Sequence, residues 1–240
     1  MHRFFAERVN DHEALLPPEE SRHATTVLRL KAGDEVCAVV DGELYRAQII
    51  DVADAVRLTL FEALPSPEAR TRVTLYQGLP KGDKMDFIVQ KCTEAGIDAV
   101  APVLMPRSVV KLDQKDAEKR AERWRRIALE AAKQSGRTRA PLVRTPIGAG
   151  EMIAALSQCP LVLVPWEDER AVSVRAALHG RSEQDIALVI GPEGGMGAEE
   201  IERLKGAGAL PVTLGPRIFR TETAGLAALV MVLTLRGDYE

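Results

Sequence analysis

The segment from Arg217 to Thr223 concentrates the side chains best suited to chemistry. It reads R-I-F-R-T-E-T, so that Arg217, Arg220 and Glu222 lie close together beside two threonines. A carboxylate can accept or orient a proton, and arginines can stabilise negative charge that develops on a substrate. The almost entirely apolar segment Gly225 to Leu235 follows directly. Polar groups beside such a segment are costly to bury without partners or a purpose, so the cluster indicates a site.

Two glycine turns are expected to position this cluster. The apolar run Ile186 to Ile190 predicts a buried strand that stops in Gly191-Pro192-Glu193-Gly194-Gly195. A helix is expected over Ala198 to Gly206, and a second apolar segment, Pro211 to Leu214, leads into Gly215-Pro216. Ligands of open α/β sheets bind beyond the carboxyl ends of strands, so the two turns predict a pocket. Two tight turns without a ligand are the simpler alternative.

The chain before these turns predicts the rest of a parallel α/β sheet. Strands and helices alternate, with the loop Gly78 to Asp83 after the first strand and Gly96 as a C-cap. The expected strands are Arg72 to Gln77, Ile97 to Leu104 and Leu161 to Pro165, and the expected helices are Lys84 to Ala95, Ala117 to Ser135 and Ala149 to Leu156. Trp166 follows the last of these strands, where it either walls the pocket or packs in the core.

The first residues predict a separate small β-domain. Short strands are expected over Glu35 to Val40, Leu44 to Val52 and Ala55 to Phe61, with a hairpin at Asp41-Gly42 and a helix over Glu19 to Leu30 before them. Such strands suggest a small barrel. Pro65 and Pro67 mark a semi-rigid linker. We therefore expect two domains, residues 1–66 and residues 71–240.

Composition excludes several classes of protein. Hydrophobic residues make up 46% and charged residues 28%, with a net charge of -3, as in soluble globular proteins. Neither a signal peptide nor a membrane-spanning run is expected. The three cysteines, Cys37, Cys92 and Cys159, are isolated, which fits a reducing cytoplasm and predicts no metal site.

One stretch is strongly basic. Arg107 to Arg144 holds 12 Lys and Arg against 5 Asp and Glu, a local net charge of +7. Within it, Trp124, Ile127 and Ala131 share one face of the expected helix. A run of charges is usually a solvated helix face. Lys133, Arg137 and Arg139 lie at and beyond the helix end, however, and arginine can pair with phosphate and stack on unpaired bases, so RNA contact is an attractive alternative.

The glycine turns carry a resemblance to a known family. L-V-I-G-P-E-G-G-M (Leu188 to Met196) and L-G-P-R-I-F-R-T-E-T-A (Leu214 to Ala224) resemble the C-terminal signature of the SPOUT methyltransferases. More narrowly, they resemble the bacterial ribosomal RNA small subunit methyltransferase E family, which methylates N3 of a uridine in 16S ribosomal RNA. The segments 23–34, 81–96 and 122–137 are similar to the same family. Phe219 and Ala95 depart from it, because a leucine is usual at each position.

The resemblance implies a PUA-like barrel that holds RNA, followed by a SPOUT α/β domain with a deep trefoil knot. It also implies a homodimer, S-adenosylmethionine as the cofactor, and 16S ribosomal RNA or the small ribosomal subunit as the partner. The expected cofactor-binding residues are Gly191, Pro192, Glu193, Gly194, Gly195, Leu214, Gly215, Ile218, Phe219 and Arg220. The expected RNA-binding residues are Arg3, Arg22, His23, Arg29, Lys81, Arg107, Lys133 and Arg137.

Methyl transfer to a uracil suggests chemical roles for Arg217, Arg220 and Glu222. The N3 atom carries a proton at neutral pH, so Glu222 is a candidate base or orienting carboxylate, and Arg220 or Arg217 can stabilise negative charge on the base carbonyls. Alternatively, Arg220 and Glu222 form a structural ion pair that shapes the turn.

Other functions are also weighed. A non-catalytic RNA-binding assembly protein would need no small-molecule pocket, and a methyltransferase of this type could act on another RNA position. A nucleotide-dependent enzyme would hold phosphate at Gly191 to Gly195, but that turn lacks both the G-x-x-x-x-G-K-[ST] and the G-x-G-x-x-G pattern.

Overall fold

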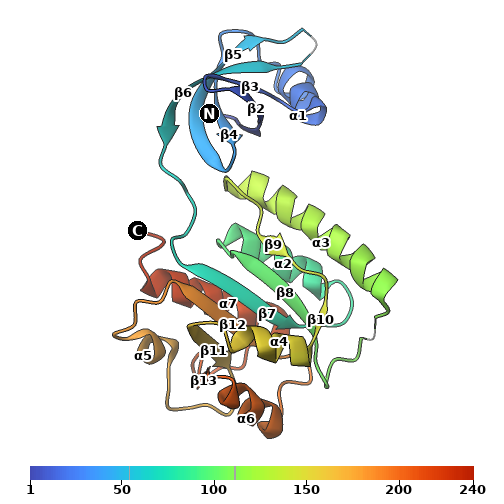
Figure 1. Ribbon diagram of the computed structural model, residues 1–240, viewed down its shortest axis with the longest axis vertical. Helices are drawn as coiled ribbons and strands as arrows, with labels where there is room; N and C mark the ends of the chain where they lie inside the picture. Colours follow the sequence, from blue (N-terminus) through green and yellow to red (C-terminus); the bar gives the residue numbers. More distant parts are fainter. Residues whose placement is uncertain (54, 111) are drawn as a thin grey trace. The chain divides into compact units, whose positions relative to one another are not determined.

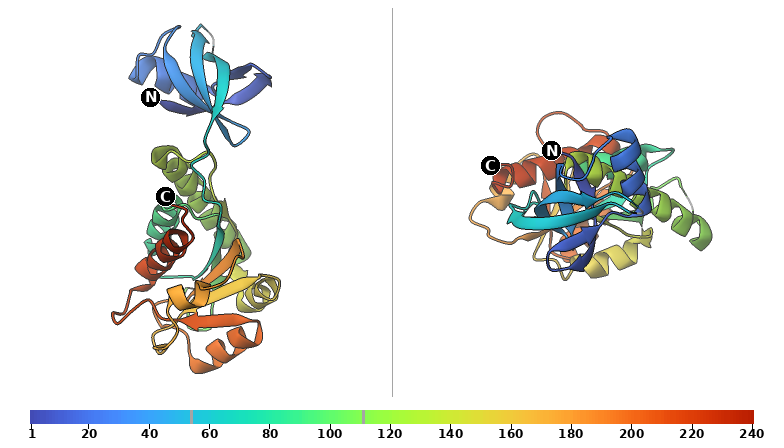
Figure 2. Two further views of the ribbon diagram at one scale, coloured as in Figure 1. Left: turned by 90° about the vertical axis from the view of Figure 1, so that its left-hand side faces the viewer. Right: turned by 90° about the horizontal axis from the view of Figure 1, so that it is seen from above.

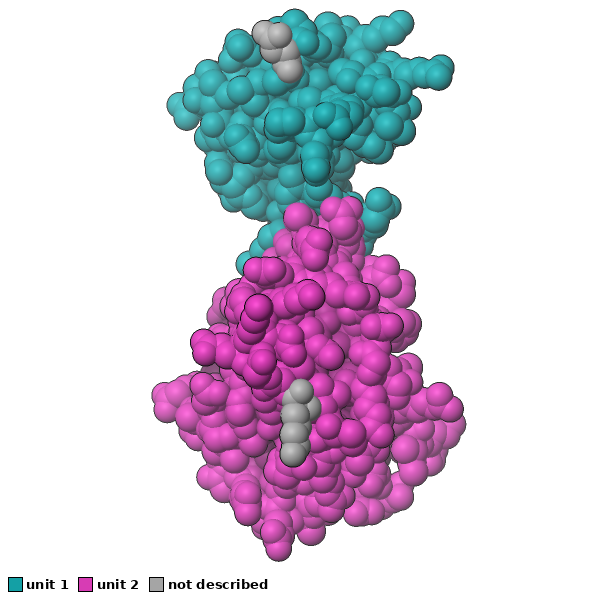
Figure 3. Space-filling view, turned by 90° about the vertical axis from the view of Figure 1, so that its right-hand side faces the viewer, with its two compact units in different colours: residues 1–68, 132–139 teal, residues 69–131, 140–240 magenta. Residues whose placement is uncertain are grey.

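The computed structural model describes residues 1–53, 55–110 and 112–240 as two compact units. Unit 1 comprises residues 1–68 and 132–139, and unit 2 comprises residues 69–131 and 140–240 (Figure 3). Lys111, a member of the basic stretch, lies outside the described residues. The chain divides inside the expected linker, but nothing in the sequence pattern indicates that residues 132–139 belong with the first unit. Each unit is described by itself.

Unit 1 is built on one six-stranded sheet in the order β1-β4-β5-β6-β3-β2 (Figure 1). Its strands are β1 (Arg3–Phe5), β2 (Glu7–Asn10), β3 (Glu13–Leu15), β4 (Glu35–Val40), β5 (Glu43–Asp51) and β6 (Arg57–Leu64). Only the β1–β4 pair is parallel. Within the described chain the path of paired strands has two ends, so the expected barrel is an open half-barrel. Strands β1 to β3 have only three or four residues each, too few for a clear alternation of apolar and polar side chains.

The helix expected over Glu19 to Leu30 is shorter and irregular. Helix α1 spans Pro18–Arg22, and a π-helical turn, η1, continues over His23–Val27. Arg29 then has a φ of 57°, in the left-handed region that right-handed helices exclude, which explains why the helix stops. The hairpin is as predicted: Asp41 and Gly42 both have positive φ, as the tight turn between twisted strands requires.

Unit 2 is a parallel sheet covered by helices on both faces. Its central path runs β10-β8-β7-β12-β11-β13, and β9 also pairs with β8. The strands are β7 (Arg72–Gly78), β8 (Ala99–Leu104), β9 (Leu142–Val143), β10 (Ile147–Gly148), β11 (Leu161–Pro165), β12 (Asp185–Ile190) and β13 (Ala209–Val212). The helices are α2 (Lys84–Glu94), α3 (Gln114–Ser135), α4 (Ala149–Leu156), α5 (Val174–Leu178), α6 (Ala198–Gly206) and α7 (Thr221–Leu235), and the last residues of α3, 132–135, belong to unit 1. No described helix is both long and apolar enough to cross a membrane.

The two faces of this sheet form two hydrophobic cores. Helices α2, α3, α5 and α7 pack on one face, with Leu75, Leu163 and Leu188 among the buried residues of the sheet. Helices α4 and α6 cover the other face (Figure 2). Val162 and Val189 are buried beneath them. Strands β11 and β12 are buried on both faces, which explains why their sequences are nearly continuous apolar runs.

Helix α7 is covered within the chain itself. It begins at Thr221 rather than Gly225, and it packs against α2, α5, β7 and β12. Its residues Ala228, Leu229, Val232 and Leu233 are fully buried. The apolar composition of this segment therefore does not by itself require a partner subunit, because the chain's own helices and strands already shield most of it from water.

Candidate functional site

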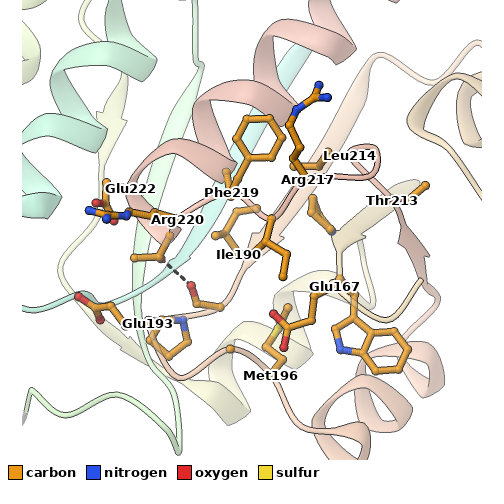
Figure 4. Close-up of a pocket in the computed structure, with 18 of the residues that line it drawn as sticks. Glu167, Ile190, Glu193, Met196, Thr213, Leu214, Arg217, Phe219, Arg220 and Glu222 are labelled. Carbon is orange, nitrogen blue, oxygen red and sulfur yellow. Dashed lines mark hydrogen bonds between the residues drawn. The ribbon is translucent and has the colours of Figure 1, made fainter. Parts of the chain in front are cut away.

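A cavity of about 450 Å³ opens where β11, β12 and β13 end (Figure 4). Because the three strands are parallel neighbours, their carboxyl ends lie on the same edge of the sheet. The cavity is lined by Lys84, Pro165, Trp166, Glu167, Arg170, Ile190, Gly191, Pro192, Glu193, Gly195, Met196, Thr213, Leu214, Gly215, Arg217, Ile218, Phe219, Arg220, Thr221, Glu222 and Ala224. Both glycine turns therefore face one pocket, as their positions after buried strands predict.

The first glycine turn is tight, and there is no space for larger residues around it. Gly195 has a φ of 65° and donates its N–H to Pro192 O at 2.9 Å. A Cβ atom on Gly78 would lie 2.6 Å from Pro192 N, closer than carbon and nitrogen can approach. The end of β7 therefore needs glycine so that the turn can pack directly against it.

A buried hydrogen-bond chain ties this turn to the start of α7. Gln77, which is fully buried at the end of β7, donates from Nε2 to Thr221 Oγ1 at 2.9 Å. Thr221 Oγ1 in turn donates to Gly191 O at 2.7 Å. Two side chains thus link β7, the glycine turn and the first residue of α7, and they fix the wall of the cavity on one side.

Lys84 connects the first glycine turn to the start of α7 through two carboxylates. Its Nζ lies 3.0 Å from Glu193 Oε1 and 3.4 Å from Glu222 Oε2. Burial alone would raise the pKa of Glu193, but hydrogen bonds from Lys84 Nζ and from backbone N–H groups, including that of Lys81, hold this pKa below its ordinary value. The hydrogen bond to Glu193 raises the pKa of Lys84. The carboxylate of Glu193 is therefore ionised and engaged by lysine.

Arg220 and Glu222 do not form the ion pair that the alternative interpretation of this segment expects. Glu222 Oε2 is buried, has no hydrogen-bond partner and has Lys84 as its ion partner. Within the described chain neither Arg217 nor Arg220 has an acidic partner, and both are exposed at the cavity. The alternative of an Arg220–Glu222 ion pair that shapes the turn is therefore wrong. The two arginines leave their guanidinium groups available to a ligand.

Comparison with known proteins decides the family. A model described as an RNA methyltransferase domain matches residues 67–233, and one described as an RNA methyltransferase PUA domain matches residues 16–60. The chain is 36% identical to ribosomal RNA small subunit methyltransferase E of Bacillus subtilis (strain 168), over 99% of this chain and 100% of that protein. The chain belongs to the ribosomal RNA small subunit methyltransferase E family.

Solved structures agree with this assignment. The ribosomal RNA small subunit methyltransferase E of Neisseria gonorrhoeae, bound to S-adenosyl methionine, superposes with a TM-score of 0.81 at 32% identity over 98% of each chain. A putative methyltransferase of Legionella pneumophila in complex with the same cofactor gives a TM-score of 0.78 at 31% identity, covering 97% of this chain and 96% of that one. The predicted family and its two-part fold, a PUA domain followed by an α/β methyltransferase domain, are confirmed. The trefoil knot stays a prediction.

Most residues predicted to hold the cofactor lie at the cavity of this family member. The exception is Gly194, whose Cα faces the Arg107 side chain instead of the cavity. Ile218 lines the cavity but is 77% exposed, and Phe219 packs partly against the hydrophobic core. Trp166 combines both expected roles, because it lines the cavity and packs against the core under α4 and α6.

The predicted RNA-binding residues fall in both units. They differ in exposure and in whether their side chains already form salt bridges or hydrogen bonds. In unit 1, Arg22, His23 and Arg29 are exposed, Arg3 is half-buried beside Gly136, and Lys133 pairs with Glu20 at 2.7 Å. Arg137 is buried, and its guanidinium donates to Glu68 at 2.6 and 3.0 Å, which leaves it little surface to offer RNA. In unit 2, Lys81 is exposed and Arg107 donates to Gly194 O at 3.1 Å.

Sequence reasoning missed several residues of the site. Gln77, Lys84, Glu167, Arg170 and Met196 either line the cavity or support it. Gln77 had a usable signal, because it is the single amide at the end of an apolar strand. Lys84 had a weaker one, since it lies three residues after Lys81 at the start of a helix. Glu167 directly follows Trp166 after a buried strand, on the side where the pocket is expected, whereas Arg170 comes from the loop beyond it without any distinguishing pattern.

Proposed function

We propose that the protein transfers a methyl group from S-adenosylmethionine to N3 of a uridine in the 16S ribosomal RNA of the small subunit, in the cytoplasm. The observation that carries this proposal is the cavity at the ends of β11, β12 and β13. It brings a buried carboxylate, Glu222, together with two unpaired arginines in a chain of the ribosomal RNA small subunit methyltransferase E family.

The cavity fits S-adenosylmethionine by its size and lining. Its volume of about 450 Å³ is in the range of small-molecule sites. Gly191, Gly195 and Gly215 leave backbone groups accessible to a ligand, and Ile190 and Leu214 provide apolar wall. The buried N–H of Trp166 at this wall has no hydrogen-bond partner, so it can donate to a bound ligand. When bound, the cofactor supplies an electrophilic methyl group.

Glu222 is suited to remove the N3 proton of uracil. The Glu222 side chain lines the cavity and its Oε2 accepts no hydrogen bond in the structure, so the carboxylate has lone pairs available to an N–H group. Lys84 Nζ lies 3.4 Å from this same oxygen and thereby restricts the orientation of the carboxylate. Proton transfer of this kind typically contributes about 100- to 10,000-fold in rate.

Arg220 and the start of α7 are suited to stabilise the uracil anion that proton removal leaves. Arg220 is the N-cap of α7, a 15-residue helix whose positive dipole end lies at the cavity. Because Arg220 and Arg217 have no acidic partner in the described chain, their guanidinium groups can donate to the carbonyl oxygens that flank N3. The charge is then stabilised where it develops.

RNA recognition is proposed to be shared between the domains, 1–66 and 71–240. Arg22, His23 and Arg29 are exposed in unit 1, and Lys81 and Arg107 are accessible in unit 2. Removing residues 1–66 should leave cofactor binding nearly intact and abolish most RNA affinity. Full-rate methylation by the truncated protein would contradict a recognition role for the first domain.

A homodimer formed through the second domain is proposed from the family resemblance. Val230 on α7 is 38% exposed and offers a limited apolar contact surface. Analytical ultracentrifugation at micromolar concentration measures the assembly directly, and a monomer under these conditions would contradict the proposal.

The decisive test is methylation of 16S ribosomal RNA, free and assembled in the small subunit, followed by mass spectrometry of the nucleosides. We expect 3-methyluridine in one of the two substrates. A methyl group on another atom or base would change the assignment of the target. Calorimetry with S-adenosylmethionine and with ATP separates the remaining alternatives: a non-catalytic RNA-binding protein binds neither, and a nucleotide-dependent enzyme binds ATP.

A further inference from the structure

Helix α3 carries a row of basic side chains outside the cavity described above. Lys119, Arg120, Arg123 and Arg126 recur at helical spacing, and together with Asp116 they surround a hollow of about 390 Å³. From Lys119 to Arg126 the row extends roughly 10 Å along the helix. All of these residues belong to unit 2.

Three members of the row lack a partner. Within the described residues, the side chains of Lys119, Arg120 and Arg126 form neither a salt bridge nor a hydrogen bond, whereas Arg125 on another face pairs with Glu118 at 2.6 Å. Like charges three and four residues apart destabilise a helix. A row that keeps such charges unpaired therefore indicates a polyanionic partner.

The row is connected to the cavity through one carboxylate. Arg123 and Trp124 donate to Asp86 at 2.5 and 3.0 Å, which ties α3 to the first turn of α2. Lys84 in the same turn reaches Glu193 and Glu222 at the cavity. The first turn of α2 thus contacts Arg123 of the row through Asp86 and the cavity carboxylates through Lys84.

We propose that Lys119, Arg120 and Arg126 form a docking surface for the phosphate backbone of the RNA substrate. The proposal rests on the proposed function and adds to it a surface of unit 2 that holds the strand beside the target base. Phosphate is the favoured partner because guanidinium groups pair with its oxygens in a fork geometry, and because the contact requires no base sequence. Arg123, which is held by Asp86, supports the row.

The test compares two triple variants with three charges removed in each. The first is Lys119→Gln with Arg120→Gln and Arg126→Gln. The matched control is Arg175→Gln with Arg203→Gln and Lys205→Gln, on the exposed faces of α5 and α6. Binding of a 16S ribosomal RNA fragment is measured by fluorescence anisotropy over a series of salt concentrations. S-adenosylmethionine affinity and melting temperature are recorded for each protein.

We expect the α3 variant to bind RNA at least about tenfold more weakly at low salt. The slope of log K against log[salt] should fall in magnitude by about 2, since each lost single-strand phosphate contact removes roughly 0.7. The control should keep the wild-type slope. If the triple variant does not fold, Arg126→Gln alone should lower the slope by about 0.7.

Two outcomes would overturn the docking surface. The first is wild-type affinity and slope in the α3 variant. The second is normal binding of free RNA with loss of binding only to the assembled subunit, which would assign the row to an acidic ribosomal protein. Both are distinct from failure of the proposed function, in which the wild-type protein itself would methylate no ribosomal RNA.

Discussion

Lys84 and Glu222 meet at the cavity, with Nζ 3.4 Å from Oε2, although one begins α2 and the other lies in the first turn of α7. The same ammonium group binds Glu193 in the first glycine turn at 3.0 Å. One lysine thus links the first glycine turn to the start of α7 at the proposed active site. Because its own side chain is about one-third exposed, its contribution to folding stability should be small.

Replacing Lys84 should therefore affect the reaction more than the fold. In Lys84→Met, Glu222 loses the contact that restricts its orientation, and we expect the single-turnover methylation rate to fall at least about tenfold. This is less than the roughly 100-fold or larger effect of removing a proton-transfer group, because the carboxylate itself remains. The melting temperature should change little. Lys84→Arg keeps the charge and should recover part of the rate. Equal rates in Lys84→Met and the wild-type protein would contradict the positioning role.

Arg220→Ala and Glu222→Gln test the chemistry itself. Loss of a group that stabilises developing charge typically costs about 100- to 1,000-fold in rate, and we expect this loss in single-turnover methylation with little change in S-adenosylmethionine affinity. Since the two side chains form no ion pair with each other, the effects on melting temperature should be small and separate. Near-wild-type turnover in both variants would remove these residues from the mechanism.

The first glycine turn can be tested by one substitution within it and one on the strand that packs against it, each of which should disturb the turn for a different physical reason. Gly195→Val places a branched side chain where φ is 65° and where a Cβ would already lie 3.4 Å from Glu167 Oε1, so cofactor binding should be lost. Gly78→Ala forces a Cβ against the backbone of Pro192 and should lower both the melting temperature and the cofactor affinity. Gly150→Ala, at a helical position with open space around it, is the control. Unchanged cofactor affinity in Gly195→Val would place the cofactor elsewhere.

Local patterns predict the fold well, and they predict the site only in part. The runs that become β4, β11, α4 and α6 have clear apolar patterns bounded by glycine, proline or charged residues, so their bounds follow from the sequence within a residue. The cavity follows from two glycine turns at the ends of parallel strands. The contacts of Lys84 with Glu193 and Glu222 do not follow, because they depend on the packing of α2 beside both turns. The contacts of Glu68 do not follow from the sequence either, because its partners, Arg137 and Thr138, lie far from it along the chain.

The three thiols should differ sharply in reactivity. Cys92 is fully buried, and this burial raises its pKa to about 12, so almost no thiolate forms at neutral pH. Cys37 and Cys159 are both half-buried. Burial also raises the pKa of Cys159. In native protein at pH 8, alkylation followed by peptide mass spectrometry should label Cys37 first and Cys159 more slowly, and leave Cys92 unlabelled until denaturant is added. Rapid labelling of Cys92 in the native state would contradict the buried packing of α2.

Glu68 should matter more for stability than any exposed carboxylate of unit 1. It accepts from Arg137 Nε and from the backbone N–H of Thr138 at 3.0 and 2.8 Å, and the Glu68 and Arg137 side chains are only 10% and 6% exposed. Removal of one partner of a buried ion pair leaves an uncompensated charge, so Glu68→Gln should lower the free energy of unfolding by on the order of 3 kcal/mol. Glu62→Gln breaks an exposed pair with Arg46 and should cost little.

The stabilisation by Glu68 should also depend on pH in a defined direction. Burial opposes ionisation of this carboxyl, but the hydrogen bond and charge of Arg137 prevail and hold its pKa in the folded protein below the ordinary value of 4.5. A depressed folded-state pKa contributes stability above the unfolded-state pKa, and that contribution is lost as pH falls through the folded-state pKa. The difference in unfolding free energy between the wild-type protein and Glu68→Gln should therefore be constant from pH 6 to 8 and shrink below about pH 4.5. Urea unfolding at a series of pH values measures it, and a difference that grows as the solution becomes more acidic would contradict the ion pair.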